Sequence, residues 1–300
     1  MHPAGSVILF TVLSGLGFGA MALIGLGAAP AGPMGLAVSV LALGLGAIGL
    51  TASTFHLGNP QRAWRALSQW RSSWLSREGV VSIALMIAFF AFTLDWWARG
   101  APSPSLGALA AALAVLAVIC TAMIYGQLRT VPRWSNPFTP AMFLGAAAAG
   151  GALLVGLAHA FAGEAPPRGL GLVLLLGSAM VYAYRRRAMT ITLKEAGSTP
   201  ETATGLGHLG RVRMVEPPHS APNYLMKEMV FRVGRKHAEK LALLATLFGL
   251  FAPLFLFILA KGAAPLLGLA LLLHVAGMLA FRWLFFAEAA HSVGLYYGRR

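Results

Sequence analysis

A histidine, a glutamate and several arginines gather where two apolar stretches of the sequence meet. His56 ends one stretch, Glu78 opens the next, and the polar segment between them carries Arg62. An imidazole exchanges a proton near neutral pH, and a half-buried carboxyl group can share that proton. Quinone and quinol chemistry moves protons together with electrons. We therefore predict a quinone site in which His56 and Glu78 transfer protons, with the arginines of the polar segment beside them.

Tryptophan side chains flank this group of ionisable residues. Trp64 and Trp74 lie in the same polar segment, and we expect them to wall a quinone ring, with Arg71 beside them. A histidine at a helix end can instead be a purely structural hydrogen-bonding group. Both interpretations of His56 stay open on this evidence.

The last apolar stretch carries further ionisable residues at a depth where charged groups are costly. It contains His274 and Arg282 and continues to Glu288 and His291. Glu288 and His291 are three residues apart and are expected to share a helical face, which Arg282 does not. They form either a satisfied polar cluster or a part of the quinone pocket or of a proton exit.

The composition predicts the elements that position these residues. Of the 300 residues, 58% are hydrophobic and 11% are charged, and the mean hydropathy is +0.73. A soluble protein has about 25% charged residues, and a disordered chain is poor in apolar ones. We predict an all-α polytopic membrane protein, one domain over residues 1–300, with eight transmembrane helices of roughly 20 residues each. They cover residues 6–29, 32–55, 79–98, 106–127, 140–161, 169–185, 240–259 and 264–284.

The distribution of Lys and Arg predicts the orientation. The second, fourth and sixth connections hold most of these residues, whereas the opposite side holds Arg99, Arg168 and Lys261. Basic loops favour the cytoplasmic side, so both termini are expected in the cytoplasm. The same bias accounts for the net charge of +14, and we expect no nucleic-acid partner.

Two connections on the basic side have patterns of their own. Residues 59–74 alternate tryptophan with arginine, which is typical of an amphipathic helix at the membrane surface; Asn59 would cap it and Pro60 would begin it. An ordinary basic loop is the alternative. Residues 188–237 are too many for a plain link, and we expect an irregular first part and an amphipathic second part, NYLMKEMVFRVGRKH. We predict a partner-docking surface made of Arg65, Arg77, Arg211, Arg213 and Lys227.

Two segments resemble a known family, the membrane anchor subunits of the dimethyl sulfoxide reductase family. They are residues 56–63 (HLGNPQRA) followed by Ser76-x-Glu78, and residues 130–134 (TVPRW) followed by Thr139-Pro140. The resemblance implies eight spans and a bound menaquinone or ubiquinone. It also implies an iron–sulfur partner and a molybdopterin catalytic partner, in a hetero-trimer or a dimer of trimers. Within the family pattern the quinone-site histidine falls on His56, the acidic residue on Glu78 and the basic residue on Arg62.

The long sixth connection is similar to that of cytoplasmic sulfite dehydrogenase anchors in the same family. The resemblance implies sulfite oxidation coupled to quinone reduction, with the partners on the cytoplasmic face of a bacterial inner membrane. This chain would then be part of an enzyme without carrying a catalytic metal centre. The alternative is the anchor of an S- or N-oxide reductase that oxidises menaquinol.

Other classes of membrane protein remain as less favoured alternatives. A haem-b cytochrome needs facing histidines. The pairs His56 with His291 and His159 with His274 make one formally possible, but His159 and His274 match poorly in depth, and we expect no haem. A secondary transporter places charges near the midplane, whereas these crowd one boundary. Cys120 is the single cysteine, so a disulfide or a cysteine-ligated cluster within the chain is excluded, and we expect no metal site.

Overall fold

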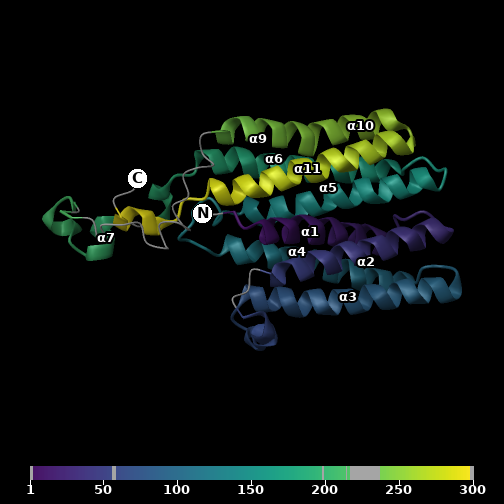
Figure 1. The fold of residues 1–300 in the computed structure, drawn as a ribbon, viewed down its shortest axis with the longest axis horizontal. Coiled ribbons are helices and arrows are strands. Elements are labelled where there is room, and N and C mark those ends of the chain that lie inside the picture. Colours follow the sequence, from purple (N-terminus) through teal and green to yellow (C-terminus); the bar gives the residue numbers. More distant parts are fainter. Residues whose placement is uncertain (1–2, 56–58, 198, 214, 217–236, 298–300) are drawn as a thin grey trace.

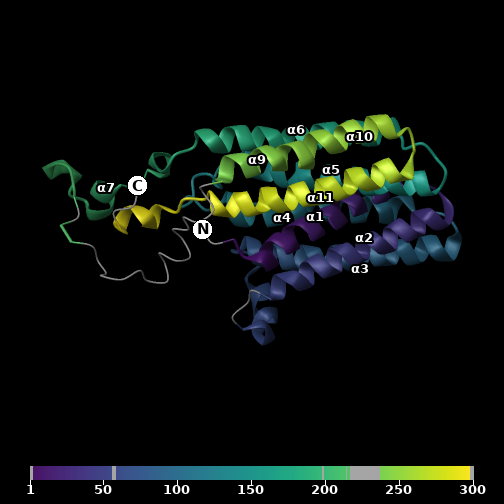
Figure 2. The same cartoon turned by 45° about the horizontal axis from the view of Figure 1, so that its top comes forward.

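The structure is a computed structural model that describes residues 3–55, 59–197, 199–213, 215–216 and 237–297. Within these ranges every regular element is a helix, as the sequence predicted, and no strand occurs. The long helices run side by side as a bundle (Figures 1 and 2). They are α1 (Gly5–Gly25), α2 (Gly32–Thr54), α3 (Trp74–Arg99), α4 (Pro104–Gly126), α5 (Phe138–Phe161), α6 (Arg168–Thr190), α9 (Ala238–Thr246), α10 (Ala252–Ala260) and α11 (Ala264–Ala287).

Among the residues that the structure describes, seven helices are long and apolar enough to cross a membrane by length and composition. These are α1 to α5, the continuous helix made of α9 and α10, and α11. Helix α6 lies against α5 in the same bundle, but Arg168 at its start and Arg185 to Arg187 near its end lower its hydropathy. Seven of the eight predicted transmembrane helices are thus matched by candidate spans, and the predicted span at residues 169–185 falls on the more polar helix α6.

The connections divide the bundle into two ends. One end, here called the turn end, has the short connections 26–31, 100–103, 162–167 and 261–263. The opposite end, here called the loop end, holds the start of α1 and the longer connections, and both termini lie toward it (Figure 1). The residues singled out for chemistry in the sequence belong to the loop end and to the helix segments directly below it.

Small residues let the central helices approach closely. A Cβ atom at Gly19 of α1 would lie 1.8 Å from the carbonyl oxygen of Ala147 in α5, and one at Gly49 of α2 would lie 2.5 Å from the amide nitrogen of Ser14. Helices in membranes associate by such close packing, since lipid offers no hydrophobic driving force between them. This contact places α1 at the centre of the bundle, against α2, α4 and α5.

The helix between residues 238 and 260 contains an irregular turn. Pro253 has no N–H to donate to the carbonyl of Gly249 four residues earlier, and residues Leu247–Phe251 widen into a π-helical turn. Nδ1 of His274 in α11 lies 2.7 Å from the Gly249 oxygen and supplies the missing donor. Gly277 allows this approach, because a Cβ there would lie 2.3 Å from the Gly249 backbone.

Short helices cover the loop end. Residues Pro60–Gln69 form a 3₁₀ helix, η1, so the predicted helix after Asn59 exists, but the Asn59 side chain makes no capping hydrogen bond. In the sixth connection the first part, predicted irregular, contains η2 (Leu193–Ala196), α7 (Pro200–Thr204) and η3 (Gly207–Leu209). Its predicted amphipathic second part lies outside the described residues. A last 3₁₀ helix, η6, covers Ser292–Tyr297.

Candidate functional site

Glu78 is a buried carboxyl group one turn into α3. The Ser73 side chain caps this helix by accepting a hydrogen bond from the Ser76 amide nitrogen, at 3.4 Å. The Glu78 side chain is 5% exposed and accepts a hydrogen bond from the Thr121 hydroxyl of α4. Buried carboxylates are normally paired with a charge or a metal. Among the described residues Glu78 forms no ion pair, which marks it as a candidate for proton transfer.

Thr121 can follow the protonation state of Glu78. Its oxygen lies close to the Glu78 carboxyl and 3.1 Å from the carbonyl oxygen of Ala117, yet a hydroxyl has one hydrogen to donate. When Glu78 is ionised, Thr121 donates to it. When Glu78 is protonated, the carboxyl group can donate to the Thr121 oxygen, and the hydroxyl hydrogen turns to Ala117. Neither state leaves the pair without a hydrogen bond.

The 3₁₀ helix η1 is fastened to the start of α3. The Ser76 hydroxyl donates to the Ala66 carbonyl, and Leu67 packs where Gly79 has no side chain. Arg77 donates from Nε to the Trp70 carbonyl at 2.9 Å and from Nη2 to the Arg71 carbonyl at 2.7 Å. Arg77, predicted as a docking residue, thus holds η1 in place.

The structure separates η1 from the Glu78 carboxyl group. Ser76 and Gly79 are three residues apart and share one face of α3, whereas Glu78 lies on another face and contacts α4. Arg62 is exposed on η1, and no hydrogen bond or ion pair joins it to Glu78 in the described part of the chain. His56, the other central residue of the predicted site, lies outside the described residues.

The tryptophans of this connection point outward. Trp64 is 68% exposed and Trp74 is half-buried. The nearest guanidinium carbons lie 5.5 Å from the Trp64 ring centre, from Arg65, and 4.4 Å from the Trp74 ring centre, from Arg77. Arg71 is exposed in the same way beside Trp70. This arrangement fits an interfacial segment; in this conformation the two tryptophans do not close around Glu78.

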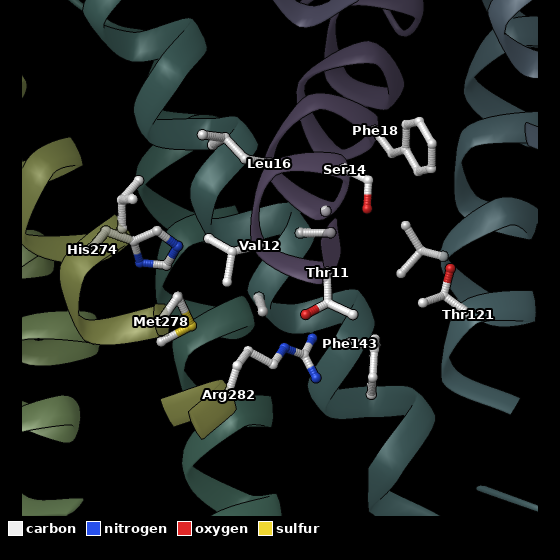
Figure 3. Close-up of a pocket in the computed structure, with 15 residues that line it drawn as sticks. Thr11, Val12, Ser14, Leu16, Phe18, Thr121, Phe143, His274, Met278 and Arg282 are labelled. Carbon is white, nitrogen blue, oxygen red and sulfur yellow. The ribbon is translucent and has the colours of Figure 1, made fainter. Parts of the chain in front are cut away.

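A cavity with a mostly apolar wall and five polar side chains lies behind Glu78, between α1, α4, α5 and α11 (Figure 3). Its volume of about 30 Å³ has room for roughly two water molecules. The polar side chains that line it are Thr11, Ser14, Thr121, His274 and Arg282. Thr121 therefore belongs both to this cavity and to the hydrogen bond with Glu78. The hydroxyl groups were missed in the sequence, because isolated threonines and serines in apolar helices usually bond their own backbone.

Arg282 borders the cavity from α11. Its guanidinium carbon lies 3.6 Å from the ring centre of Phe143, and Nη1 lies 3.6 Å from the sulfur of Met142. The Phe143 ring packs against Tyr125 and Phe285, which together with Trp134 form an aromatic cluster at the loop end of the bundle. Cation–π contact with Phe143 explains how the stem and head of Arg282 are packed.

Glu288 and His291 do not share a helical face, because α11 ends at Ala287. Glu288 forms the C-cap and is paired with Arg185 of α6 and with Arg133, whose Nη1 lies 3.6 Å from its carboxylate. His291 follows the helix, and its Nδ1 accepts a hydrogen bond of 3.0 Å from the Val293 amide. Burial lowers the pKa of His291 below its usual value. Glu288 thus belongs to a polar cluster in which its carboxylate is paired with two arginines.

The segment 130–140 is tied into the bundle by several hydrogen bonds. The Trp134 indole donates to the Phe285 carbonyl at 2.9 Å, and the Thr139 hydroxyl donates to the Trp134 carbonyl at 2.6 Å. The Ser292 amide donates to the Thr130 carbonyl at 2.8 Å. This connection therefore positions the end of α11 and the chain that follows it.

The remaining docking candidates lie at the loop end. Arg65, Arg211 and Arg213 are exposed, and Lys227 lies outside the described residues. Next to the two loop arginines, Glu201 accepts a hydrogen bond of 3.1 Å from the Val212 amide, which ties η3 and its neighbours to α7. Hydrogen bonds from its own backbone and from Thr199 lower the pKa of Glu201.

The buried histidines are engaged in hydrogen bonds. His159 lies with Nδ1 2.8 Å from the Glu164 carboxylate and with Nε2 2.9 Å from the Ala28 carbonyl oxygen, near the turn end. Nδ1 of His274 is directed at Gly249. No group of three or more His, Cys, Asp or Glu side chains able to hold a metal occurs in the residues that the structure describes.

Comparison with known proteins gives the class of this chain. A family model described as the DMSO reductase anchor subunit (DmsC) matches residues 1–166. The chain therefore belongs to the family of DMSO reductase anchor subunits, and it is a membrane protein.

Two relatives give the comparison more detail. A protein of Allochromatium vinosum that is named as a sulfite dehydrogenase subunit is 34% identical over 327 aligned positions, which cover 99% of each chain. Anaerobic dimethyl sulfoxide reductase chain YnfH of Escherichia coli is 37% identical over 103 positions, which cover 32% of this chain and 34% of the relative. The resemblance noted in the sequence is confirmed.

Proposed function

We propose that this chain anchors a molybdopterin oxidoreductase that oxidises sulfite, and that it binds the quinone that receives the electrons. The observation that carries the proposal is Glu78, a buried carboxyl group without a charged partner among the described residues, hydrogen-bonded to Thr121 beside the cavity. Similarity over almost the full length to a protein named as part of a sulfite dehydrogenase supports the substrate. Molybdopterin and iron–sulfur clusters would reside in partner subunits and supply the electrons.

The part of this chain in the reaction is proton transfer and binding. Quinone reduction takes up protons, and Glu78 would give its proton to a quinone oxygen while Thr121 turns from Ala117 to the carboxylate. His56 would serve the second oxygen, and Arg62 would bind the ring from η1. Because η1 and the Glu78 carboxyl group lie on different faces of α3, we expect the start of η1, with Arg62, to move toward the Glu78 carboxyl group when quinone binds.

The proposal includes an orientation in the membrane. Helix α6 has 23 residues, which at about 1.5 Å per residue is enough to cross roughly 30 Å of hydrocarbon; we infer that it is the eighth span. The many arginines and lysines at the loop end favour the cytoplasmic side of a bacterial membrane for that end and for both termini. The iron–sulfur and catalytic subunits would dock there, on η1 and on the loop 188–237, in a hetero-trimer or a dimer of trimers.

The second candidate is the anchor of an S- or N-oxide reductase that oxidises menaquinol. The partial similarity to the chain YnfH favours it. In that case Glu78 would take up a proton from quinol instead of giving one. The two candidates are separated by assaying the purified complex with sulfite plus quinone and with dimethyl sulfoxide plus quinol.

The test of the proposed site uses the intact complex. We expect Glu78→Gln to lower quinone-linked sulfite oxidation by about 100-fold or more, the usual contribution of a positioned acid or base. Sulfite oxidation with an artificial acceptor that takes electrons directly from the soluble subunits should stay at the wild-type rate. Glu164→Gln, which makes the same change in a half-exposed residue at the turn end, is the control. Wild-type quinone-linked activity of Glu78→Gln would contradict the proposed role.

A further inference from the structure

Arg282 is a buried cation to which the proposed function gives no role. Its side chain is 3% exposed, and its head touches the Phe143 ring and the Met142 sulfur. Neither group carries a net negative charge. In the described part of the chain Arg282 forms no ion pair. A buried guanidinium without compensation is costly, so a negative charge must act on it from further away.

Glu78 is a buried acid without a basic partner in contact among the described residues, and it lies at the same depth of the bundle as Arg282. It lies in the second turn of α3 from the loop end, and Arg282 lies in the second turn of α11 from that end. The hydrogen bond from Thr121 is neutral. The interior at the loop end therefore holds one buried acid and one buried base, each without a charged neighbour in contact.

The cavity described above lies between Arg282 and Thr121, the hydrogen-bond partner of Glu78. Arg282 and Thr121 both line it, and Figure 3 draws them on either side of Thr11. On α4, one turn after Thr121, the Tyr125 ring packs against Phe143 and Phe285, the two rings that lie under the Arg282 guanidinium. The wall of this cavity is mostly apolar, but its hydroxyl and guanidinium groups offer hydrogen-bond partners for ordered water in a cavity of this size.

We propose that Arg282 is the buried counter-charge of Glu78, joined to it through Thr121 and water in the cavity, and that it holds Glu78 ionised in the resting protein. Arg282 is a positioning residue, because it keeps its proton throughout. Glu78 becomes protonated when a proton arrives from the loop end, and it passes this proton on. The transfer of this proton to quinone rests on the proposed function, whereas the charge pair of Glu78 and Arg282 does not.

The other ionisable groups near the pair do not replace either partner. The ionisable groups near Glu78 are Arg77 on the same helix and Cys120 and Tyr125 on α4. Arg77 is engaged by the backbone carbonyls of Trp70 and Arg71. Arg62 and Arg65 on η1 are exposed.

The ionisable groups near Arg282 are Tyr125, Tyr184 and His274, which are neutral in their ordinary states. Further toward the loop end, Glu288 is occupied by Arg133 and Arg185. Glu239 and Lys240, at the start of α9, are exposed.

The test reads the protonation of Glu78 directly. Infrared spectra of the intact complex in its membrane, without quinone or substrate, are recorded across pH, and the band of the protonated carboxyl group that disappears in Glu78→Gln is followed. In Arg282→Gln we expect the midpoint of this band to rise by about one pH unit, a tenfold change in proton affinity, because the cation on the other side of the cavity is lost. Arg282→Lys should restore a midpoint near that of the wild type. Arg168→Gln, an exposed arginine at the turn end, should leave it unchanged.

An unchanged midpoint in Arg282→Gln would overturn the proposal, as would equal shifts in Arg282→Gln and Arg282→Lys. Should Arg282→Gln fail to assemble, the double variant with Glu78→Gln decides: a coupled pair predicts that the double variant assembles better than Arg282→Gln alone, and no improvement refutes the coupling. The outcome is independent of turnover. If Arg282→Gln left the midpoint unchanged while Glu78→Gln lowered quinone reduction as predicted, the charge pair would be refuted and the proposed function would stand.

Discussion

The hydrogen bond between His274 and Gly249 should be replaceable by a single backbone N–H. In this helix Pro253 leaves the Gly249 carbonyl without a donor, and His274 provides one from α11 at 2.7 Å. His274→Leu removes that donor while it keeps the volume of the side chain. Pro253→Ala returns an N–H at the place where the α-helix resumes, four residues after Gly249. We therefore expect His274→Leu to be harmful in the wild-type background and nearly harmless in Pro253→Ala.

The expected magnitude follows from the environment of the carbonyl. A buried carbonyl left without a donor costs about 1–3 kcal/mol, whereas hydrogen bonds between membrane helices average about 0.6 kcal/mol with a maximum near 1.7. His274 is 3% exposed, and its partner Gly249 is buried, so the upper part of the membrane range applies. We expect His274→Leu to lower the free energy of unfolding by about 1.5 kcal/mol, and by less than about 0.5 kcal/mol in Pro253→Ala.

The assay is a double-mutant cycle on unfolding free energies, measured by titrating the purified chain in mixed micelles with SDS and following tryptophan fluorescence. The cycle subtracts the packing that Pro253→Ala itself removes, so the coupling of about 1 kcal/mol isolates the shared carbonyl. Equal costs of His274→Leu in both backgrounds would refute the argument. They would show that His274 stabilises the bundle by packing and that the proline does not create the need for it.

Two further predictions concern the loop end. Glu288→Gln removes the carboxylate that two arginines share, and because Glu288 is 15% exposed we expect a loss of about 1–3 kcal/mol of stability in thermal denaturation. The control is Glu195→Gln, whose pair with an arginine is 41% exposed on both sides and which should cost less than about 0.5 kcal/mol. Equal losses in the two variants would contradict the role of burial. Replacing Arg211 and Arg213 by Ser should release the soluble subunits at lower salt than in the wild type, as followed by co-purification across a salt series. The same change at Arg168 on the turn end should have no effect, and unchanged attachment in the loop variant would refute the docking role.

The apolar helices were predictable because membrane insertion depends on local composition. Twenty apolar residues must form a helix in hydrocarbon, since no water is there to satisfy the backbone. The predicted spans therefore coincide with helices within a few residues, as for 32–55 and α2. The end of the last span was less predictable: α11 stops at Ala287, and the residues beyond it are organised by the connection that holds Thr130 and Trp134.

The candidate site was predictable in its residue types and less so in its geometry. A carboxyl group at the start of a span was singled out from the sequence, and Glu78 is indeed buried there. Its partner Thr121 lies 43 residues away in the chain, in a helix whose polar residues give no pattern. Likewise the expected face shared by Glu288 and His291 assumed a continuous helix, which the C-cap at Glu288 interrupts.

The sequence by itself determined the class of this protein, its helical content and the concentration of basic residues at one end, because each depends on composition within a short segment. Only the tertiary structure decided which of the buried polar groups meet. Pro253 leaves a carbonyl free wherever the helix is placed, but the choice of His274 as its donor depends on the close contact at Gly277. In the same way the shared cavity of Thr121 and Arg282 exists because α1, α4, α5 and α11 pack around it. Unpaired polar groups are costly in an apolar interior, so the packing of the helices determines which of them are satisfied and which remain available for chemistry.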